Sequence, residues 1–204
     1  MPTSTFFNLP PEKRERLLAA ARAEFARVSL AGASVNRIIR QAGIPRGSFY
    51  MYFADKEELF FYLLEEYRQQ LTETMDGILE EQAGDLFGAF LAMFDRIQDC
   101  RDGTWRMLLD ILRRNQQMRS SIFLQRNREG RLLEFPAGRV DRTRLDLRQE
   151  GDLESIVYLL VSAAMEAVRA ADQSGDRDGA RAQLVQMFEI IRRGAERRDA
   201  PETK

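Results

Sequence analysis

Histidine is absent from this chain of 204 residues, and cysteine and tryptophan each occur only once. Without histidine, the chain forms no Ser–His–Asp or Cys–His nucleophile and lacks a ligand common in zinc and di-iron carboxylate sites. Chemistry based on carboxylate pairs, a lysine Schiff base or a carboxylate-held magnesium ion stays open. We nevertheless expect a protein that is not an enzyme and that binds neither a metal nor a cofactor.

Long hydrophobic runs are also lacking. The longest stretches without a charged residue have eleven residues, such as residues 155–165, and are too short to cross a bilayer. Residues 1–11 place no basic residue before an apolar core, so they do not resemble a secretory signal. The single cysteine, Cys100, excludes an intramolecular disulfide and fits a reducing compartment. We therefore expect a cytoplasmic protein that does not enter the membrane.

Charge of one sign is unevenly distributed along the chain. Hydrophobic residues make up 44% and charged residues 31%, which is typical of a globular protein. Residues 1–56 carry nine Lys or Arg against four Asp or Glu, whereas the remainder carries 22 against 28. A basic first segment joined to an acidic remainder suggests that the first segment binds an anionic polymer. A local excess that arose by chance is the alternative.

Apolar residues recur with helical spacing along nearly the whole chain, and no run has the alternation expected of a strand. The expected helices span about residues 10–28, 35–42, 45–52, 56–82, 85–101, 104–114, 118–133, 152–172 and 177–197. Residues 135–151, which contain a proline, two glycines and many charges, are expected to form an irregular connection. The sequence predicts an all-α fold with a three-helix head, residues 1–55, and a larger helical bundle, residues 56–204. The helix that starts at residue 56 would link the two.

Local signals mark the ends of the first helices. Asn8 and Ser34 have side chains suited to capping a helix N-terminus. Gly43 readily adopts the left-handed conformation that ends a helix. Asp55 and Glu58 form a D-x-x-E variant of the capping box at the start of the fourth helix.

The second and third short helices, joined by a turn inside the basic segment, have the composition of a helix-turn-helix. In this motif the second helix of the pair enters the major groove of DNA. Gly47 leaves no side chain between this helix and the bases, and Arg46 offers a planar guanidinium that suits guanine O6 and N7. The side chains suited to phosphate oxygens are those of Ser34, Ser48, Tyr50, Tyr52 and Lys56.

The run SVNRIIRQAGIPRGSFYMYF from Ser34 to Phe53, with DKEEL at residues 55–59, resembles the N-terminal domain of the tetracycline-repressor (TetR-type) family. RLLAAA at residues 16–21 and Phe25 also fit the first helix of that family. The resemblance covers roughly residues 13–64, and the remaining chain is similar only in being all-helical and of the right length. It implies a homodimeric transcription regulator, usually a repressor, with one reading head per subunit and a C-terminal ligand domain.

The resemblance assigns roles to individual residues. By position, Asn36 and Arg46 are expected to contact bases, and Gly47 to allow close approach. The residues expected to contact phosphates are Ser34, Ser48, Tyr50, Tyr52 and Lys56. Pro45 stands where the family often has a capping serine, and Tyr52 where histidine is common. The implied partners are a palindromic double-stranded DNA operator, a second copy of the chain and a small-molecule effector. A helical small-molecule or protein-binding module without specific DNA recognition is the alternative.

Several of these side chains also have purely structural readings. Phe49 and Phe53 are four residues apart on one helical face, so we expect both in the core. Arg37 and Arg40 are read as a solvated helix face that attracts DNA electrostatically, with direct contact as the alternative. Met51 either touches a thymine methyl group or is simply exposed.

The C-terminal part is expected to hold a dimer interface and an effector pocket. The residues expected at a two-fold interface are Ile156, Val157, Leu160, Val161, Ala164, Leu184, Phe188 and Ile191. Those expected to line a pocket are Phe90, Met93, Phe94, Trp105, Leu109 and Phe123. An ordinary intramolecular core is the alternative for both sets. The sequence does not decide between a hydrophobic effector and an anionic one.

Overall fold

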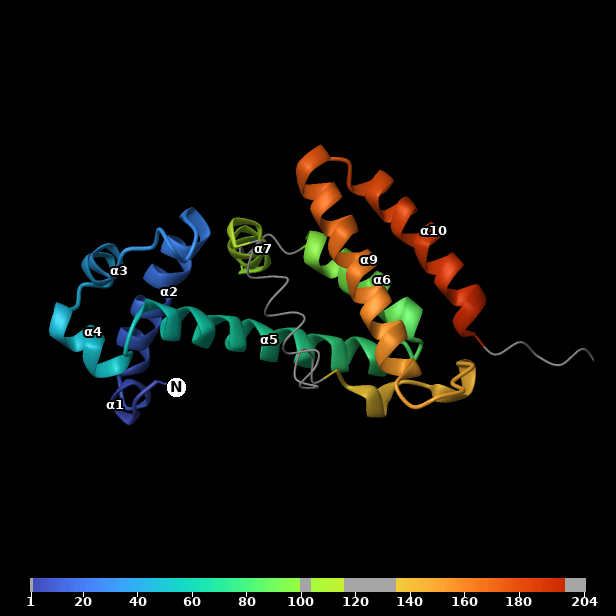
Figure 1. The fold of residues 1–204 in the computed structure, drawn as a ribbon, viewed down its shortest axis with the longest axis horizontal. Coiled ribbons are helices and arrows are strands. Elements are labelled where there is room, and N and C mark those ends of the chain that lie inside the picture. Colours follow the sequence, from blue (N-terminus) through green and yellow to red (C-terminus); the bar gives the residue numbers. More distant parts are fainter. Residues whose placement is uncertain (1, 100–103, 116–134, 197–204) are drawn as a thin grey trace, which may run out of the picture. The chain divides into compact units, whose positions relative to one another are not determined.

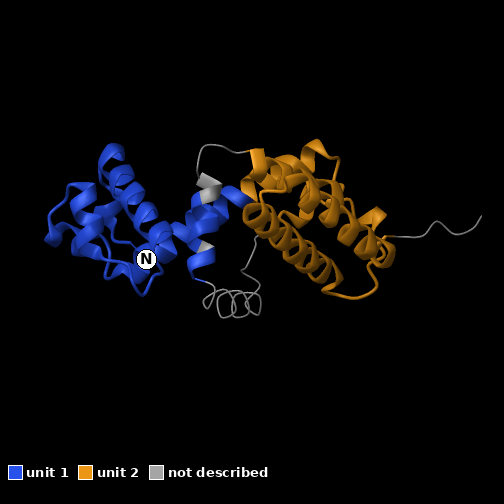
Figure 2. Ribbon diagram, turned by 90° about the horizontal axis from the view of Figure 1, so that it is seen from above, with its two compact units in different colours: residues 1–71, 102–134 blue, residues 72–101, 135–204 orange. Residues whose placement is uncertain are grey.

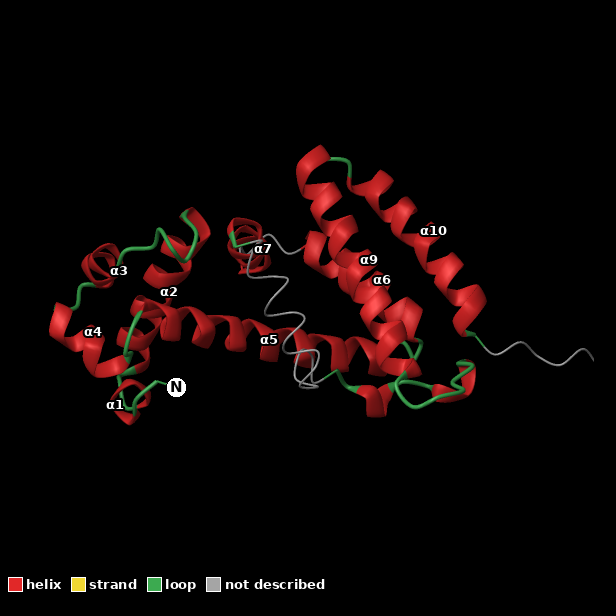
Figure 3. Cartoon of the chain, viewed as in Figure 1, coloured by secondary structure: helices red, strands yellow, loops and turns green. Residues whose placement is uncertain are grey.

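The computed structural model describes residues 2–99, 104–115 and 135–196, and within these ranges the regular elements are helices (Figures 1 and 3). The α-helices are α1 (Ser4–Phe7), α2 (Pro11–Arg27), α3 (Val35–Ala42), α4 (Arg46–Tyr52), α5 (Lys56–Glu81), α6 (Leu86–Asp99), α7 (Thr104–Arg114), α9 (Asp152–Ser174) and α10 (Arg177–Ala195). The prediction of an all-α fold is confirmed. The helix predicted at residues 118–133 lies outside the described residues.

The chain divides into two compact units (Figure 2). Residues 1–71 and 102–134 form the first, called the head unit, and residues 72–101 and 135–204 form the C-terminal unit. Helix α5 contributes to both, because its residues 56–71 belong to the head unit. The predicted domain boundary between residues 55 and 56 separates the DNA-binding part from the rest by function. It stays a prediction.

Aromatic side chains fill the core of the head unit. The side chains of Phe25, Phe49 and Phe53 have no exposed surface, and Phe60 is 2% exposed. The Phe25 and Phe60 rings meet edge to face with centroids 5.0 Å apart, which joins α2 to α5. Each such side chain stabilises the fold by about 2 kcal/mol through burial. The prediction that Phe49 and Phe53 belong to the core is confirmed.

Helix α7 also belongs to the head unit and packs against α2. Beside it, the buried side chain of Asn115 accepts a hydrogen bond from the Leu30 backbone N–H at 2.9 Å and donates to the Ile111 carbonyl at 2.8 Å. The Arg114 guanidinium donates to the Ala26 carbonyl at 2.8 Å. These bonds satisfy backbone groups at the end of α2, in the loop that leads to α3 and in α7 itself.

The predicted helix ends are only partly correct. Asn8 does not cap α2; it ends α1, a short helix that the sequence analysis missed, while α2 begins after Pro10. A proline at the first helical position needs no capping partner because it has no N–H group. The Glu58 N–H donates to the Asp55 carboxylate at 2.7 Å, as predicted, but the Glu58 carboxylate accepts from Ala54.

The C-terminal unit is built around α6, α9 and α10. Helices α9 and α10 lie side by side, joined by a turn at Gly175, and α6 packs against both (Figure 1). The rings of Phe87 and Phe188 meet edge to face at 6.2 Å between α6 and α10. On the same pair of helices, the Arg181 guanidinium donates to both Asp95 carboxylate oxygens, with its Nε at 2.8 Å from Oδ1. Apolar packing and this charged pair together hold α10 to α6.

The connection before α9 is irregular, as predicted, apart from two 3₁₀ turns at Ala137–Arg139 and Arg142–Arg144. It packs on the turn between α5 and α6, where the Asp141 N–H donates to the Gly84 carbonyl at 3.1 Å. The Arg139 guanidinium binds both carboxylate oxygens of Asp76 at 3.1 and 3.2 Å. Within the described residues, no helix is long and apolar enough to span a membrane.

Candidate nucleic-acid interface

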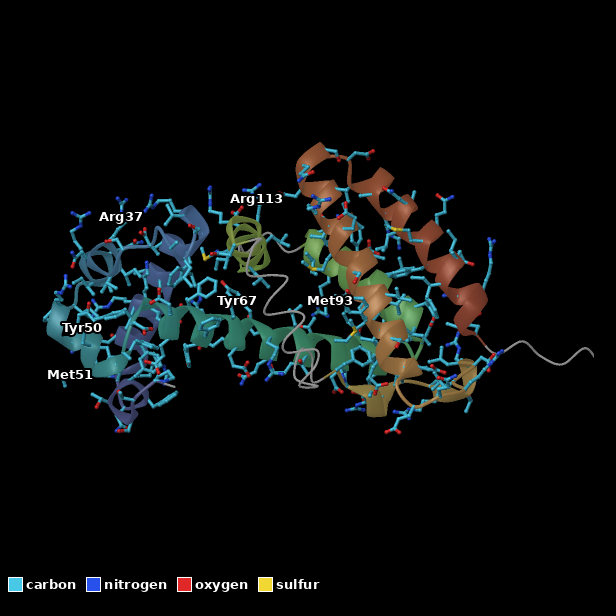
Figure 4. All side chains as sticks on the ribbon, viewed as in Figure 1. Arg37, Tyr50, Met51, Tyr67, Met93 and Arg113 are labelled. Carbon is cyan, nitrogen blue, oxygen red and sulfur yellow. The ribbon has the colours of Figure 1, made fainter. Side chains whose placement is uncertain are left out.

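Helices α3 and α4 form the predicted helix-turn-helix. Helix α3 ends at Gly43, whose φ of 67° is the left-handed conformation predicted for it. Pro45 then precedes α4, a helix of seven residues. One face of α4 buries Phe49, while the side chains of Tyr50 and Met51 are 48% and 58% exposed at its outer face (Figure 4). Half of this short helix is therefore available to a partner.

Arg46 is held between two other predicted contact residues. Its Nη1 atom donates to Asn36 Oδ1 at 2.5 Å, and its Nη2 atom donates to the Tyr50 hydroxyl at 3.3 Å. The guanidinium carbon also lies 5.6 Å from the centroid of the Tyr50 ring, within the range of a cation–π contact. The structure thus joins Asn36 of α3 to Arg46 and Tyr50 of α4 on one exposed surface, which we call the reading cluster.

Packing within the described residues gives no reason for glycine at residue 47. The residue is exposed, its φ lies outside the left-handed range, and an added Cβ atom would meet nothing within 4 Å. A small residue here leaves this face of α4 open to close approach by a partner. Ser48, the next residue, is partly exposed on the same short helix.

Lys56 does not extend freely into solvent, because its ammonium group is bonded to the protein. Its ammonium group donates to the carbonyl oxygens of Ala31 at 3.0 Å and Ala33 at 3.1 Å. These bonds tie the start of α5 to the loop before α3, and they leave one N–H of the ammonium for another acceptor. A phosphate contact by Lys56 stays a prediction, whereas its role in holding this loop was missed from the sequence.

Glu24 organises the other end of α3, and sequence reasoning also missed it. Its carboxylate is 1% exposed, accepts from the Ser34 backbone N–H at 3.1 Å and binds the Arg27 guanidinium at 2.9 Å. The Ser34 side chain itself makes no capping bond, so its hydroxyl is not used to cap α3. The available signal was a carboxylate beside Phe25 on the face of α2 that carries the apolar residues.

Arg37 and Arg40 lie on the solvent side of α3, as predicted. The Arg37 Nε atom also lies 3.7 Å from Glu24 Oε2. Both residues border an open hollow of about 310 Å³ between α2 and α3, which Arg27 also lines. The flank of α3 therefore carries a cluster of positive charge next to Asn36.

The predicted pocket residues are spread over both units. Phe90, Met93 and Phe94 are buried in the core of the C-terminal unit, where the Phe90 ring stacks on Phe135 with centroids 6.1 Å apart. Leu109 is partly exposed on α7 of the head unit. Trp105 also lies on α7, but its side chain and all of Phe123 fall outside the described residues. The grouping of these six residues into one pocket stays a prediction.

Tyr67 is a polar side chain on α5 to which the sequence analysis assigned no role. Tyr67 is 3% exposed, and its hydroxyl has no hydrogen-bond partner among the described residues. Burial raises the pKa of this hydroxyl above its ordinary value, so it stays protonated at neutral pH. A buried hydroxyl without a partner costs free energy and therefore calls for an explanation.

The residues predicted at a dimer interface fall into two groups. Those already buried within one chain are Ile156, Val157, Leu160, Leu184 and Phe188. Val161, Ala164 and Ile191 are partly exposed. The apolar side chains that point outward from α9 and α10 are instead Tyr158, Leu159 and Ile190, with 44%, 49% and 63% exposure. The prediction did not include these three residues.

Comparison with known proteins agrees with this geometry. Residues 17–63, which run from α2 through the helix-turn-helix into α5, match the family described as "Bacterial regulatory proteins, tetR family". Residues 17–63 therefore carry a tetR-type domain. The resemblance expected from the sequence is confirmed.

Curated relatives match over part of this chain. It is 36% identical over 70 residues to the uncharacterized HTH-type transcriptional regulator YdgC of Bacillus subtilis, covering 34% of this chain and 36% of YdgC. It is 35% identical over 79 residues to the HTH-type transcriptional repressor AcnR of Corynebacterium efficiens, covering 38% of this chain and 42% of AcnR. The chain thus spans less than half the length of these relatives.

Solved structures extend the likeness in fold to nearly the whole chain. The putative transcriptional regulator SCO4942 of Streptomyces coelicolor is 26% identical, with a TM-score of 0.57 over 88% of this chain and 97% of SCO4942. SmeT, the repressor of the Stenotrophomonas maltophilia multidrug efflux pump SmeDEF, is 20% identical, with a TM-score of 0.63 over 93% and 94% of the two chains. SmeT has also been solved as a complex with triclosan.

Proposed function

We propose that this protein is a sequence-specific DNA-binding transcriptional regulator, a repressor that a small-molecule effector releases from its operator. The observation that carries the proposal is the reading cluster, in which Arg46 contacts Asn36 and Tyr50 on the exposed face of two short helices. The excess of basic residues in residues 1–56 supports it, because DNA attracts positive charge. We place this activity in the cytoplasm and assign the chain no enzymatic role.

In this proposal α4 enters the major groove. Arg46 and Asn36 read base edges, since a guanidinium suits guanine and an amide suits adenine. Gly47 lets the helix approach closely. The side chains proposed to bind phosphates are those of Ser34, Ser48, Tyr50 and Tyr52, together with the remaining N–H of Lys56.

We further propose that two copies of the chain associate through α9 and α10. Tyr158, Leu159 and Ile190 supply an outward apolar surface that a single chain leaves exposed to water. Partly exposed Val161, Ala164 and Ile191 extend this surface. A two-fold dimer carries two copies of α4 related by symmetry, and it therefore fits a palindromic operator.

An effector changes DNA affinity only if it binds the two conformations of the repressor differently. Helix α5 contributes to both units, and Lys56 at its start holds the loop before α3. A ligand that accepts a hydrogen bond from the buried Tyr67 hydroxyl on α5 would therefore act on the element that positions the reading head. We propose a largely apolar small molecule with at least one acceptor atom for this role.

Selection of bound fragments from genomic DNA tests the proposed function directly. The selected duplex and a scrambled duplex are then titrated with the full chain at several salt concentrations. We expect the selected sequence to bind about 10³-fold more tightly or better, and its affinity to fall steeply with added salt because phosphate contacts release counterions. Equal affinity for the selected and scrambled duplexes would contradict the proposal.

A further inference from the structure

The N-terminal segment before α2 folds back onto the end of α4. The Thr3 backbone N–H donates to the Tyr52 carbonyl at 3.1 Å, and the Thr3 hydroxyl donates to the Met51 carbonyl at 2.6 Å. Helix α1, which follows Thr3, packs beside α4 (Figure 1). A segment outside the helix-turn-helix thus makes specific contacts with the helix proposed to read DNA.

The position of these bonds matters because α4 is short. A helix of seven residues is marginal by itself, and its last carbonyl groups have no partner within the helix. Phe53, the next residue, is extended rather than left-handed; its N–H donates to the Phe49 carbonyl at 2.9 Å and forms no Schellman-type turn that would reach the Met51 and Tyr52 carbonyls. Pro45 at the other end makes no side-chain capping bond. Thr3 therefore supplies an external cap for the end of α4.

Phe6 fastens the segment that carries this cap. Its side chain is fully buried, and its ring centroid lies 4.8 Å from that of Phe53 and 5.2 Å from that of Tyr62. The Tyr52 ring is 6.4 Å away. Phe6 thus packs against the residue that follows α4 and against the first turns of α5, so that Thr3 is held at a fixed place beside the last turn of α4.

We propose that Thr3 and Phe6, which we call the N-terminal clamp, are positioning residues for DNA recognition. The clamp fixes the last turn of α4 and with it the directions in which Tyr50, Met51 and Tyr52 point. It acts through α4 and contacts no DNA itself. This inference rests on the proposed function, since it assigns a specificity role to residues beyond the reading cluster.

Hydrogen exchange in the free protein tests the clamp without any DNA. The full chain is compared with Thr3→Val, which removes the hydroxyl at nearly constant shape, and with Phe6→Ala. We expect backbone amides of residues 46–53 to exchange about threefold to tenfold faster in Thr3→Val, and faster still in Phe6→Ala. Thr3→Ser, which keeps the hydroxyl, and Phe7→Ala, which truncates a ring that is 50% exposed, serve as controls. Unchanged exchange of residues 46–53 in both Thr3→Val and Phe6→Ala would overturn the proposal.

Titration of the selected and scrambled duplexes then tests the link to recognition. We expect Thr3→Val to lose about threefold to tenfold in affinity for the selected duplex but little for the scrambled one, with Thr3→Ser restoring the wild-type ratio. The salt dependence should not change, because no phosphate contact is lost. Faster exchange of α4 together with an unaltered affinity ratio would overturn the clamp. Lack of any sequence preference in the wild-type protein would instead overturn the proposed function.

Discussion

Arg46 makes all of its described contacts with residues that are themselves proposed to bind DNA. Its bonds to Asn36 and Tyr50 restrict the side chain before DNA arrives. Ordering a long side chain on binding costs about 0.5–1.5 kcal/mol, so a side chain that is already ordered binds more tightly and more selectively. The two proposed base contacts are therefore expected to behave as one unit.

A double-mutant cycle between Asn36 and Arg46 measures this dependence. Arg46→Ala should cost about 1–3 kcal/mol at one base pair of the operator and relax sequence preference there. Because the residues are in contact, the Asn36→Ala and Arg46→Ala effects should differ from additivity by at least about 0.5 kcal/mol. Competition binding with operator variants gives these values. Arg16→Ala, which removes the same charge from an exposed position of α2, should leave the preference unchanged, and additive effects would contradict the prediction.

The buried Glu24 carboxylate should matter more for stability than any exposed acid of the head unit. Glu24→Ala leaves Arg27 and the Ser34 N–H without their acceptor, and we expect the free energy of unfolding to fall by about 3 kcal/mol. Urea unfolding followed by circular dichroism measures the change. Glu15→Ala breaks an exposed pair with Arg22 and should cost about 0.5 kcal/mol or less. Similar losses in the two variants would show that burial of Glu24 is unimportant.

Lys56 is expected to stabilise the free protein, in addition to any contact that it makes with DNA. Lys56→Gln removes the charged donor from the Ala31 and Ala33 carbonyls, and we expect a loss of about 1–2 kcal/mol in the free energy of unfolding. Lys13→Gln, at an exposed position of α2, is the matched control and should have little effect. A Lys56 variant as stable as the wild type would contradict the assignment of Lys56 to the loop before α3.

At the scale of the elements, local sequence signals predicted most of the helices. Pro11, Gly43 and Pro45 each fix a helix end through their own backbone preferences, so α2, α3 and α4 were predicted close to their observed bounds. Helix α1 was missed because it has four residues and no periodicity. It is held by the packing of Phe6 against residues far along the chain.

The contrast between local signals and long-range packing also explains which parts of the candidate site were predicted. Arg46 was expected to face DNA from its place on α4, and the structure exposes it there. The contacts that Glu24, Lys56 and Thr3 make depend on residues from other elements, and a single sequence does not reveal such pairings. Five of the predicted interface residues are buried within one chain because helical periodicity marks an apolar face without naming what covers it.

Gly84 is expected to be the glycine least tolerant of substitution in the C-terminal unit. Its φ is 78°, and an added Cβ atom would lie 2.6 Å from the Asp141 nitrogen and 2.9 Å from the Arg139 carbonyl oxygen. Both neighbours are backbone atoms, so we expect Gly84→Ala to cost at least about 2 kcal/mol. Gly77→Ala, inside α5 with open space around its Cβ position, should stabilise by about 0.5–1 kcal/mol. Chemical unfolding of both variants checks the contrast, and equal effects would contradict it.

At the scale of the whole molecule, the proposed dimer depends on a surface that periodicity alone did not identify. A chain with Leu159→Asp and Ile190→Asp should sediment as a monomer under conditions in which the wild type is a dimer, because charge replaces apolar contact area. Relative to the wild type, the double variant should also lose more affinity for a palindromic operator than for a duplex that holds a single half-site. Phe61→Asp makes the same kind of change at an exposed position of the head unit and should leave sedimentation unchanged. A dimeric double variant would exclude this surface as the interface.

The N-terminal clamp has a consequence for how the protein is made. Thr3 and Met51 are 48 residues apart in the chain, so the clamp is synthesised well before the helix that it holds. Until α4 and Tyr62 have left the ribosome, Phe6 has no aromatic partners from either element, and α4 is too short to be stable by itself. The last turn of α4 and its clamp are therefore expected to become ordered together, once residues up to Tyr62 are available. A chain that lacks Thr3 and Phe6 is therefore expected to present a less ordered α4 to a partner.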